Sequence, residues 1–306
     1  MAYNAVCINV RSFSRRMIRG WLLFGQLLKL IRVKHWIKNL LVLFPFIFSG
    51  QLLAWGDAVV AFFAFSFVAS GIYVVNDLCD VDADRTHPTK CNRPLASGAV
   101  SKEWAIVGAV VLFALAFAVT ICVAAVPAAS TAYLFLYAAL NIAYSLRLKH
   151  IPIVDVAIVA AGFLLRVLYG GAFCDIWISP WLFLTVLAFA LYFALGKRRG
   201  ELKKVGSNSR PSLAGYNQAF LDKMMYVFLA CGLMYYSLWT IARAGDSSSV
   251  MLILGVPLAM IVCMRYSLIV ESDVSDGDPV GVVFSDKLLL WLVAAWMIVA
   301  IVPLYI

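Results

Sequence analysis

The chain has 306 residues, of which 64% are hydrophobic and 13% are charged, and its mean hydropathy is +0.92. Soluble domains carry roughly 25% charged residues, so this composition excludes a water-soluble globular protein and places most of the chain in lipid. The net charge of +9 is spread along the chain and not gathered in one basic domain, so no nucleic-acid partner is expected.

Residues 11–38 are rich in Arg and Lys and contain no acid. We interpret the segment 1–36 as a cytoplasmic or interfacial amphipathic helix beside anionic lipid, followed by a transmembrane catalytic domain at 37–306. A transit peptide or a twin-arginine signal shares part of this pattern, but no small-residue cleavage site follows. The seven cysteines show no metal-ligand spacing and are expected to be ordinary apolar residues.

Hydrophobic runs then follow that are long enough to cross a bilayer, which takes about 17–25 residues each. We expect a boundary between the first two runs at Gly56 and Asp57, and a turn between the third and fourth at Pro127. The predicted fold class is an all-α integral membrane protein of about nine transmembrane helices. The runs lie at 37–56, 58–78, 104–125, 129–146, 152–173, 179–196, 223–243, 249–270 and 287–306.

The basic residues predict the orientation of these helices. If the N-terminus is cytoplasmic, all 25 Lys and Arg residues except Arg166 and Arg243 fall at the cytoplasmic ends or in cytoplasmic segments. This distribution satisfies the positive-inside rule and predicts a cytoplasmic N-terminus and an external C-terminus.

Carboxylates gather at the cytoplasmic end of the second run. On a helix turning about 100° per residue, Asp77, Asp80 and Asp84 lie within roughly 60° of one another, whereas Asp82 points away. Three carboxylates on one face repel one another unless a cation lies among them. Hard oxygen ligands of this kind suit Mg²⁺, which commonly shares its coordination with substrate phosphates.

Polar residues on either side of these carboxylates complete the pattern. Asn76 precedes them, while Lys90 and Arg93 follow at a spacing that lets them meet phosphate oxygens. The alternative is a solvated acidic helix end followed by a basic loop. Acids at a membrane boundary favour the metal–diphosphate interpretation.

The order and spacing of short motifs along the chain resemble the UbiA superfamily of intramembrane prenyltransferases. Its first aspartate motif, Asn-Asp-x-x-Asp-x-x-x-Asp, runs here from Asn76 to Asp84. Within the superfamily, the chain is most similar to members that use phosphoribosyl diphosphate as donor and a polyprenyl phosphate as acceptor. The likeness rests on Trp36, Lys38, Asn39, Asp80, Val81, Ala83, Asp84, Arg85, His87, Pro88, Thr89, Lys90, Arg93, Pro94, Tyr144, Ser145, Leu148, Lys149, His150, Val154, Asp155, Arg166, Gly170, Gly171, Gly196, Lys197, Arg198, Glu201, Leu202, Arg265 and Tyr266.

The resemblance implies nine helices around a central cavity that opens to the cytoplasm and sideways to lipid. It implies a Mg²⁺-dependent enzyme of the bacterial inner membrane, with a cytoplasmic active site, that makes a precursor of cell-envelope glycolipids and can be an oligomer. The implied catalytic metal ligands are Asp77, Asp80 and Asp84. The implied substrate-binding residues are Lys38, Asn76, Lys90, Arg93, Tyr144, Lys149, Asp155, Arg166, Lys197 and Arg198.

The chain departs from the family pattern in its second aspartate motif, Asp-x-x-x-Asp. Asp155 is present, but the position four residues later is Val159. A donor with a diphosphate and a separate 5-phosphate carries more negative charge than a prenyl diphosphate, so an excess of cations favours the phosphoribosyl donor. The cations in question are Arg147, Lys149, Arg166, Lys197, Arg198 and Arg199.

Several of these residues have structural alternatives. Lys149 can be an anchor at the membrane surface, the Lys197–Arg199 run can serve only to orient the helix, and Tyr144 can belong to the aromatic belt. Arg166 lies near the centre of a run and must pair with Asp155 or with an anionic substrate.

Two other functions remain as alternatives. One is an aromatic polyprenyltransferase of the 4-hydroxybenzoate or haem O type, which the incomplete second motif disfavours. The other is a transporter, which the absence of a clear internal repeat disfavours.

Overall fold

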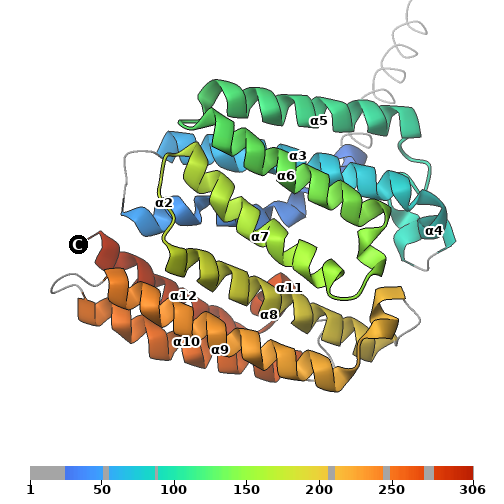
Figure 1. Ribbon diagram of the computed structural model, residues 1–306. Coiled ribbons are helices and arrows are strands. Elements are labelled where there is room, and N and C mark those ends of the chain that lie inside the picture. Colours follow the sequence, from blue (N-terminus) through green and yellow to red (C-terminus); the bar gives the residue numbers. More distant parts are fainter. Residues whose placement is uncertain are drawn as a thin grey trace, which may run out of the picture.

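The structure is a computed structural model that describes residues 25–50, 55–86, 89–205, 211–243, 249–271 and 279–305. Within these residues every regular element is a helix, and eight helices are long and apolar enough to cross a membrane (Figure 1). The all-α membrane fold class is therefore confirmed. The eight helices are α3 (Trp55–Cys79), α5 (Lys102–Val123), α6 (Pro127–Leu146), α7 (Val154–Phe173), α8 (Pro180–Val205), α9 (Gln218–Arg243), α10 (Ser249–Glu271) and α12 (Lys287–Ile301).

The first predicted run, 37–56, is not one long α-helix. It consists of the 3₁₀-helix η1 (Val33–Leu43) and the short helix α2 (Phe44–Ser49), which ends at Gly50 with a left-handed φ of 79°. The boundary expected at Gly56 and Asp57 was wrong, because α3 has already begun at Trp55. Asp57 lies in the first turn of α3, where the helix dipole favours a carboxylate.

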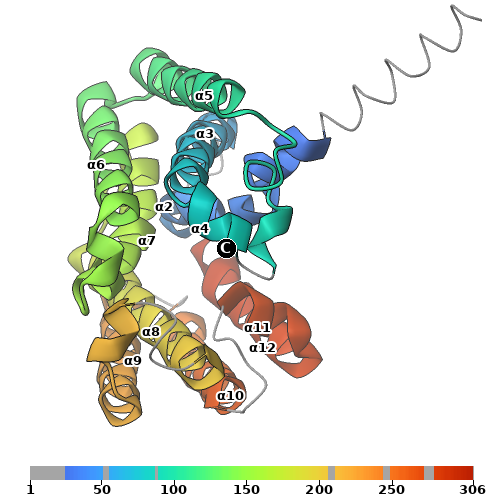
Figure 2. The same ribbon diagram turned by 90° about the vertical axis from the view of Figure 1, so that its right-hand side faces the viewer.

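The helices α3 and α7 form the centre of the bundle. Inside the protein, 61% and 67% of their most apolar stretches are buried, compared with 17% in α5 and in α12. The outer helices therefore present most of their side chains to lipid, and the central ones bury most of theirs against protein. Figure 2 views the bundle roughly along the helix axes and shows α3 inside an arc formed by the other helices.

The centre is tight enough for two backbones to touch. A Cβ atom on Gly170 of α7 would lie 1.9 Å from the carbonyl oxygen of Val42 in η1. Glycine at this position lets α7 approach η1 closely, as small residues commonly do between membrane helices. This contact holds the irregular η1 segment inside the bundle.

The connections that carry most of the polar residues lie at one end of the bundle. At this end α3 continues into α4 (Val81–Thr86) and η3 (Lys90–Asn92), and the α6–α7 connection contains η4 (Leu148–His150). The α8–α9 connection, with η6 (Pro211–Gly215), lies at the same end (Figure 1). The remaining short helices are α11 (Pro279–Ser285) and η7 (Val302–Leu304).

Part of the N-terminal segment packs on α3. Residues 25–30 are helical, and Leu30 is buried together with Val74 of α3 and Val81 of α4. Residues 1–24 lie outside the described residues, as do most of the acidic stretch 271–279 and the motif residues His87 and Pro88. The predicted interfacial helix therefore stays a prediction, and the predicted division after residue 36 falls within η1.

We expect Gly170→Ala to destabilise the protein, because the new methyl group would collide with the Val42 carbonyl. Overpacking of this kind typically costs about 1–3 kcal/mol. Gly108→Ala in α5 is the matched control, because no atom lies within 4 Å of its new methyl group. Thermal unfolding in detergent should show a lower midpoint for the first variant than for the second, and equal midpoints would contradict the close contact.

Candidate active site

The last turn of α3 and the short helix α4 carry the predicted acidic face. The N–H of Asp80 donates to the carbonyl of Asn76 (3.0 Å), and the N–H of Asp84 donates to the carbonyl of Asp80 (2.8 Å). The helical path therefore continues through the break between α3 and α4. Asp77 and Asp84 both bind Arg93. The side chain of Asp82 is 83% exposed and points away, as expected.

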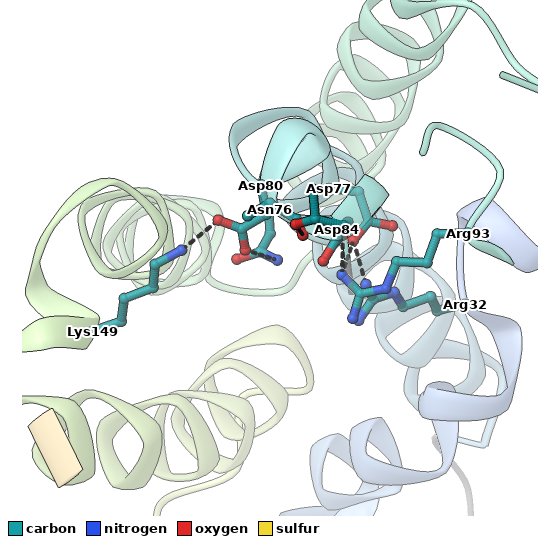
Figure 3. A network of polar contacts seen from close by, with 9 residues as sticks. Arg32, Asn76, Asp77, Asp80, Asp84, Arg93 and Lys149 are labelled. Atoms are coloured by element: carbon teal, nitrogen blue, oxygen red, sulfur yellow. Dashed lines mark hydrogen bonds and ion pairs between the residues drawn. The ribbon is translucent and has the colours of Figure 1, made fainter. Parts of the chain in front are cut away.

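Arg93 binds two of these carboxylates. Its Nη1 lies 3.1 Å from Asp77 Oδ1 and 2.6 Å from Asp84 Oδ2 (Figure 3). Asp77 and Asp84 are almost completely buried, at 2% and 3% exposed. An ionised carboxylate inside a protein requires a cation or several hydrogen bonds, and Arg93 supplies one of the cations that these two carboxylates need.

Arg32 is a second cation on Asp77, and it was not among the predicted site residues. Its Nη2 donates to Asp77 Oδ1, and its guanidinium lies over the ring of Tyr73, 4.9 Å from the ring centre. Arg32 has a left-handed backbone conformation (φ 52°) immediately before η1. The basic N-terminal segment therefore contributes at least one residue to the site, in addition to any role at the lipid surface.

A signal for Arg32 was present in the sequence of α3. Ser66, Ser70, Tyr73 and Asp77 follow one another at spacings of three or four residues and so share one face of the helix. In the structure this face binds the segment 31–39. The contacts include Trp36 Nε1 to Ser70 Oγ (2.9 Å), Ser70 Oγ to the Ile31 carbonyl (2.8 Å) and Asn39 Nδ2 to Ser66 Oγ (3.1 Å).

Asp80 faces the opposite side of the site. Lys149, from η4, donates to Asp80 Oδ1 at 2.6 Å, and Asn76 Nδ2 donates to Asp80 Oδ2 at 3.2 Å. Lys149 was expected to be a phosphate ligand or an anchor at the membrane surface, and the structure places its ammonium on the first aspartate motif. The predicted residues Asn76, Asp77, Asp80, Asp84, Arg93 and Lys149 thus come together in one network (Figure 3).

A second polar group surrounds Asp155 in the first turn of α7. Arg198 Nε lies 2.7 Å from Asp155 Oδ2, and both residues are buried. The guanidinium of Arg198 also donates to Glu201 Oε2 (2.6 Å) and to the Tyr144 hydroxyl (3.1 Å). The predicted residues Tyr144, Asp155 and Arg198 are therefore joined to one another.

Arg166 was expected to pair with Asp155 or with an anionic substrate, and the pairing with Asp155 was wrong. Its guanidinium donates to three neutral oxygens: Asn39 Oδ1 (2.9 Å), the Gly162 carbonyl (2.6 Å) and the Tyr137 hydroxyl (2.9 Å). Asp155 is unavailable because Arg198 occupies it. A role for Arg166 in substrate binding stays a prediction.

The predicted excess of cations is smaller than the sequence count indicated. Arg198 is compensated by Asp155 and Glu201, and Arg199 binds Asp222 and the Val270 carbonyl. Arg147 is exposed. The other predicted phosphate ligands, Lys38 in η1, Lys90 in η3 and Lys197 in α8, are all half-buried.

The three aspartates fit a magnesium ion in the kind of atom they offer. Mg²⁺ is usually bound through one or two carboxylates together with water and substrate phosphates, not by a cage made of protein alone. In the described part of the chain, no three His, Cys, Asp or Glu side chains are close enough to form a metal cluster by themselves. Carboxylates of this kind would suit an ion that takes its other ligands from water and a bound diphosphate.

The bundle also contains a partly open apolar cavity of about 360 Å³. The side chains that line it come from η1 and α2 and from the helices α7 to α12, so the N-terminal and C-terminal parts of the described chain form it together. The lining residues are mostly aromatic or aliphatic, among them Phe48, Phe163, Phe189, Tyr192, Trp239 and Tyr266. Such a surface suits a hydrocarbon chain.

The fold and the aspartate network define an intramembrane enzyme of the prenyltransferase type. Residues 41–284 match the UbiA prenyltransferase family, and the chain belongs to this family. It is 35% identical to decaprenyl-phosphate phosphoribosyltransferase of Corynebacterium glutamicum, over 92% of this chain and 87% of that protein. It is 33% identical to the protein of the same name in Mycobacterium tuberculosis, over 90% of this chain and 93% of that protein.

Solved structures of UbiA homologues share the fold. A digeranylgeranylglyceryl phosphate synthase matches with a TM-score of 0.69 and 18% identity, over 92% of this chain and 99% of that one. A UbiA homologue from Archaeoglobus fulgidus, bound to DMAPP and Mg²⁺, matches with a TM-score of 0.68 and the same identity and coverage. The sequence-based assignment to this superfamily is confirmed.

Arg166→Lys should destabilise the protein, because lysine keeps the charge but cannot supply the fork of donors that binds Asn39, Gly162 and Tyr137. We expect a loss of about 1–3 kcal/mol and a lower thermal midpoint. Arg85→Lys is the control, because the Arg85 side chain is 53% exposed. An unchanged midpoint combined with a loss of activity would show instead that Arg166 acts on the substrate.

Proposed function

We propose that this protein transfers the 5-phosphoribosyl group of phosphoribosyl diphosphate to a polyprenyl phosphate and releases diphosphate. The observation that carries the proposal is the network at the end of α3, where Asp77, Asp80 and Asp84 lie in direct contact with Arg32, Arg93 and Lys149. The carboxylates suit a metal–diphosphate and the cations suit further phosphate oxygens. The names of the curated relatives support the same donor and acceptor.

Asp77, Asp80 and Asp84 are the residues that would hold Mg²⁺. When bound, the ion would neutralise the diphosphate of the donor and make it a better leaving group. The UbiA homologues whose structures contain Mg²⁺ together with a prenyl diphosphate support this assignment.

The cations of the site stabilise the charge that develops during transfer. An oxygen of the lipid phosphate forms a bond to the anomeric carbon, and the bond to diphosphate breaks with its electrons on the leaving group. Arg32, Arg93 and Lys149 can exchange their carboxylate partners for these phosphate oxygens. The lipid phosphate is already an anion, so the reaction requires no general base.

The apolar cavity would hold part of the isoprenoid of the acceptor. Binding of a hydrocarbon chain there places the lipid phosphate at the edge of the apolar region and keeps water, the competing nucleophile, away. The end of the bundle that carries the network would face the cytoplasm of a bacterial cell, because the basic connections lie at that end. The resulting topology has a cytoplasmic N-terminus and an external C-terminus.

An aromatic polyprenyltransferase is the second candidate, and the surroundings of Asp155 disfavour it. Prenyltransferases that use a prenyl diphosphate resemble one another in a second acidic motif with two aspartates. Here Val159 takes the place of one and packs in an apolar cluster, while Arg198 neutralises the other.

The proposed reaction predicts a specific pattern of label transfer. Purified protein with Mg²⁺, polyprenyl phosphate and radiolabelled phosphoribosyl diphosphate should move label into the organic phase, and EDTA should abolish this transfer. Asp80→Asn should lower the rate by at least about a hundredfold. Asp82→Asn is the matched control, because Asp82 is exposed and points away from the network. Transfer of a prenyl group to 4-hydroxybenzoate, with no transfer of phosphoribose, would replace this donor assignment by the second candidate.

Arg32→Gln should weaken binding of the donor. The change removes one cation that can reach the phosphates and leaves Asp77 with Arg93 as its remaining basic partner. We expect the KM for phosphoribosyl diphosphate to rise by about tenfold, as for the loss of one charged hydrogen bond. Lys34→Gln, two residues away on an exposed side chain, provides the control. Equal KM values for the two variants would remove Arg32 from the site.

A further inference from the structure

Two connections at the polar end of the bundle are packed against each other. The α8–α9 connection contacts the α6–α7 connection through Gly215, where a Cβ atom would lie 2.5 Å from Cγ of Pro152. Tyr216 follows directly, and its side chain is buried in the same cluster as Leu213 and Leu221. The position of the α6–α7 connection is therefore determined by a segment some sixty residues later in the chain.

The hydroxyl of Tyr216 holds an unfavourable backbone conformation in place. It accepts a hydrogen bond from the N–H of Ile153, whose φ is 68°. A β-branched residue rarely adopts positive φ, and such a conformation persists only where the surroundings impose it. Ile153 immediately precedes α7, so this contact determines how the chain enters that helix.

The same hydroxyl also orients Asp155. It donates to Asp155 Oδ1 at 2.7 Å, while Asp155 Oδ2 lies 2.7 Å from Arg198 Nε. Burial raises the pKa of Tyr216, and the hydrogen bond to Asp155 raises it further, so the phenol stays protonated and remains a donor. Arg198 in turn reaches the hydroxyl of Tyr144.

The connection that Tyr216 holds carries a residue of the aspartate network. Lys149 lies in η4, four residues before Ile153, and its ammonium is 2.6 Å from Asp80 Oδ1. A shift of the connection would move Lys149 relative to Asp80. The Tyr216 hydroxyl therefore has two contacts that bear on the site. Its hydrogen bond with Ile153 holds the connection that carries Lys149, and its hydrogen bond to Asp155 orients the partner of Arg198.

We propose that Tyr216 is a positioning residue that sets the geometry of Lys149 and Arg198 for binding the phosphates of the donor. The proposal rests on the proposed function, since it assigns these two cations to the donor and not to the lipid. Tyr216 itself touches no reacting atom. Its effect reaches the site through the α6–α7 connection and through Asp155.

The test uses Tyr216→Phe in the full-length protein. The ring and its packing against Leu213 and Leu221 remain, and only the hydroxyl is lost. Tyr305→Phe is the matched control. It also removes a tyrosine hydroxyl that donates a hydrogen bond, here to the Ile47 carbonyl at 2.7 Å, but neither residue belongs to the aspartate network.

The kinetic expectation is specific to the donor. Tyr216→Phe should raise the KM for phosphoribosyl diphosphate by about tenfold, as for one lost hydrogen bond, and leave the KM for polyprenyl phosphate unchanged. Its effect should be smaller in a Lys149→Gln background, because residues that act through one another are not additive. An equal change in both KM values, or a change that Tyr305→Phe reproduces, would overturn the proposal.

A second measurement does not depend on activity. Hydrogen–deuterium exchange of the peptide covering 148–155 should be faster in Tyr216→Phe than in the parent or in Tyr305→Phe, because the N–H of Ile153 loses its acceptor. Unchanged exchange overturns the positioning role even if the parent protein transfers no phosphoribose. Faster exchange in a protein without transfer activity would leave the role of Tyr216 intact and reject the proposed function alone.

Discussion

The compensation of buried carboxylates at the end of α3 is the constraint on which the polar end of this protein depends. Asp77 and Asp84 are 2% and 3% exposed, and leaving such a group without its partner costs about 3–5 kcal/mol. Their partners, Arg32 and Arg93, come from opposite sides of α3 in the sequence. Because these charges must be compensated, the N-terminal segment, the end of α3 and the loop before α5 pack together around Asp77 and Asp84.

The exposed fraction of a charged side chain shows whether an incoming phosphate can reach it and replace its present partner. The side chains of Arg93 and Asp80 are 27% and 30% exposed, so a phosphate that approaches the site can reach them. Arg166 is 7% exposed, and its guanidinium already donates to three oxygens within the fold. Arg93 and Asp80 belong to a site that a bound phosphate can reach, whereas Arg166 stabilises the helices that support this site.

Local patterns predicted the parts of this arrangement that local geometry determines. Hydropathy alone located the eight long helices of the described residues, although the first predicted run consists of a 3₁₀-helix and a short α-helix. The 3.6-residue period predicted Asp77, Asp80 and Asp84 on one face with Asp82 turned away. Asp77 and Asp84 do share Arg93 and Asp82 is exposed, whereas Asp80 binds Lys149 on the opposite side of the site. The same reasoning could not identify Arg32, because an arginine in a basic segment looks like a lipid anchor until the polar face of α3 is matched to it. It also could not choose among partners for Arg166, since three neutral acceptors from three segments leave no charge pattern in the sequence.

The state of Asp155 connects the fold to the chemistry of the donor. A second acidic motif with two unpaired carboxylates would attract another cation, but here Val159 removes one carboxylate and Arg198 neutralises the other. The polar group around Asp155 therefore offers neutral and cationic donors, from Tyr144 and Arg198, in place of metal ligands. A donor with a diphosphate and a separate phosphate needs anion-binding groups at two points, and a site with carboxylates on one side and an arginine–tyrosine pair on the other satisfies that need. The substitution that makes the second motif incomplete is thus the same feature that makes the phosphoribosyl donor chemically reasonable.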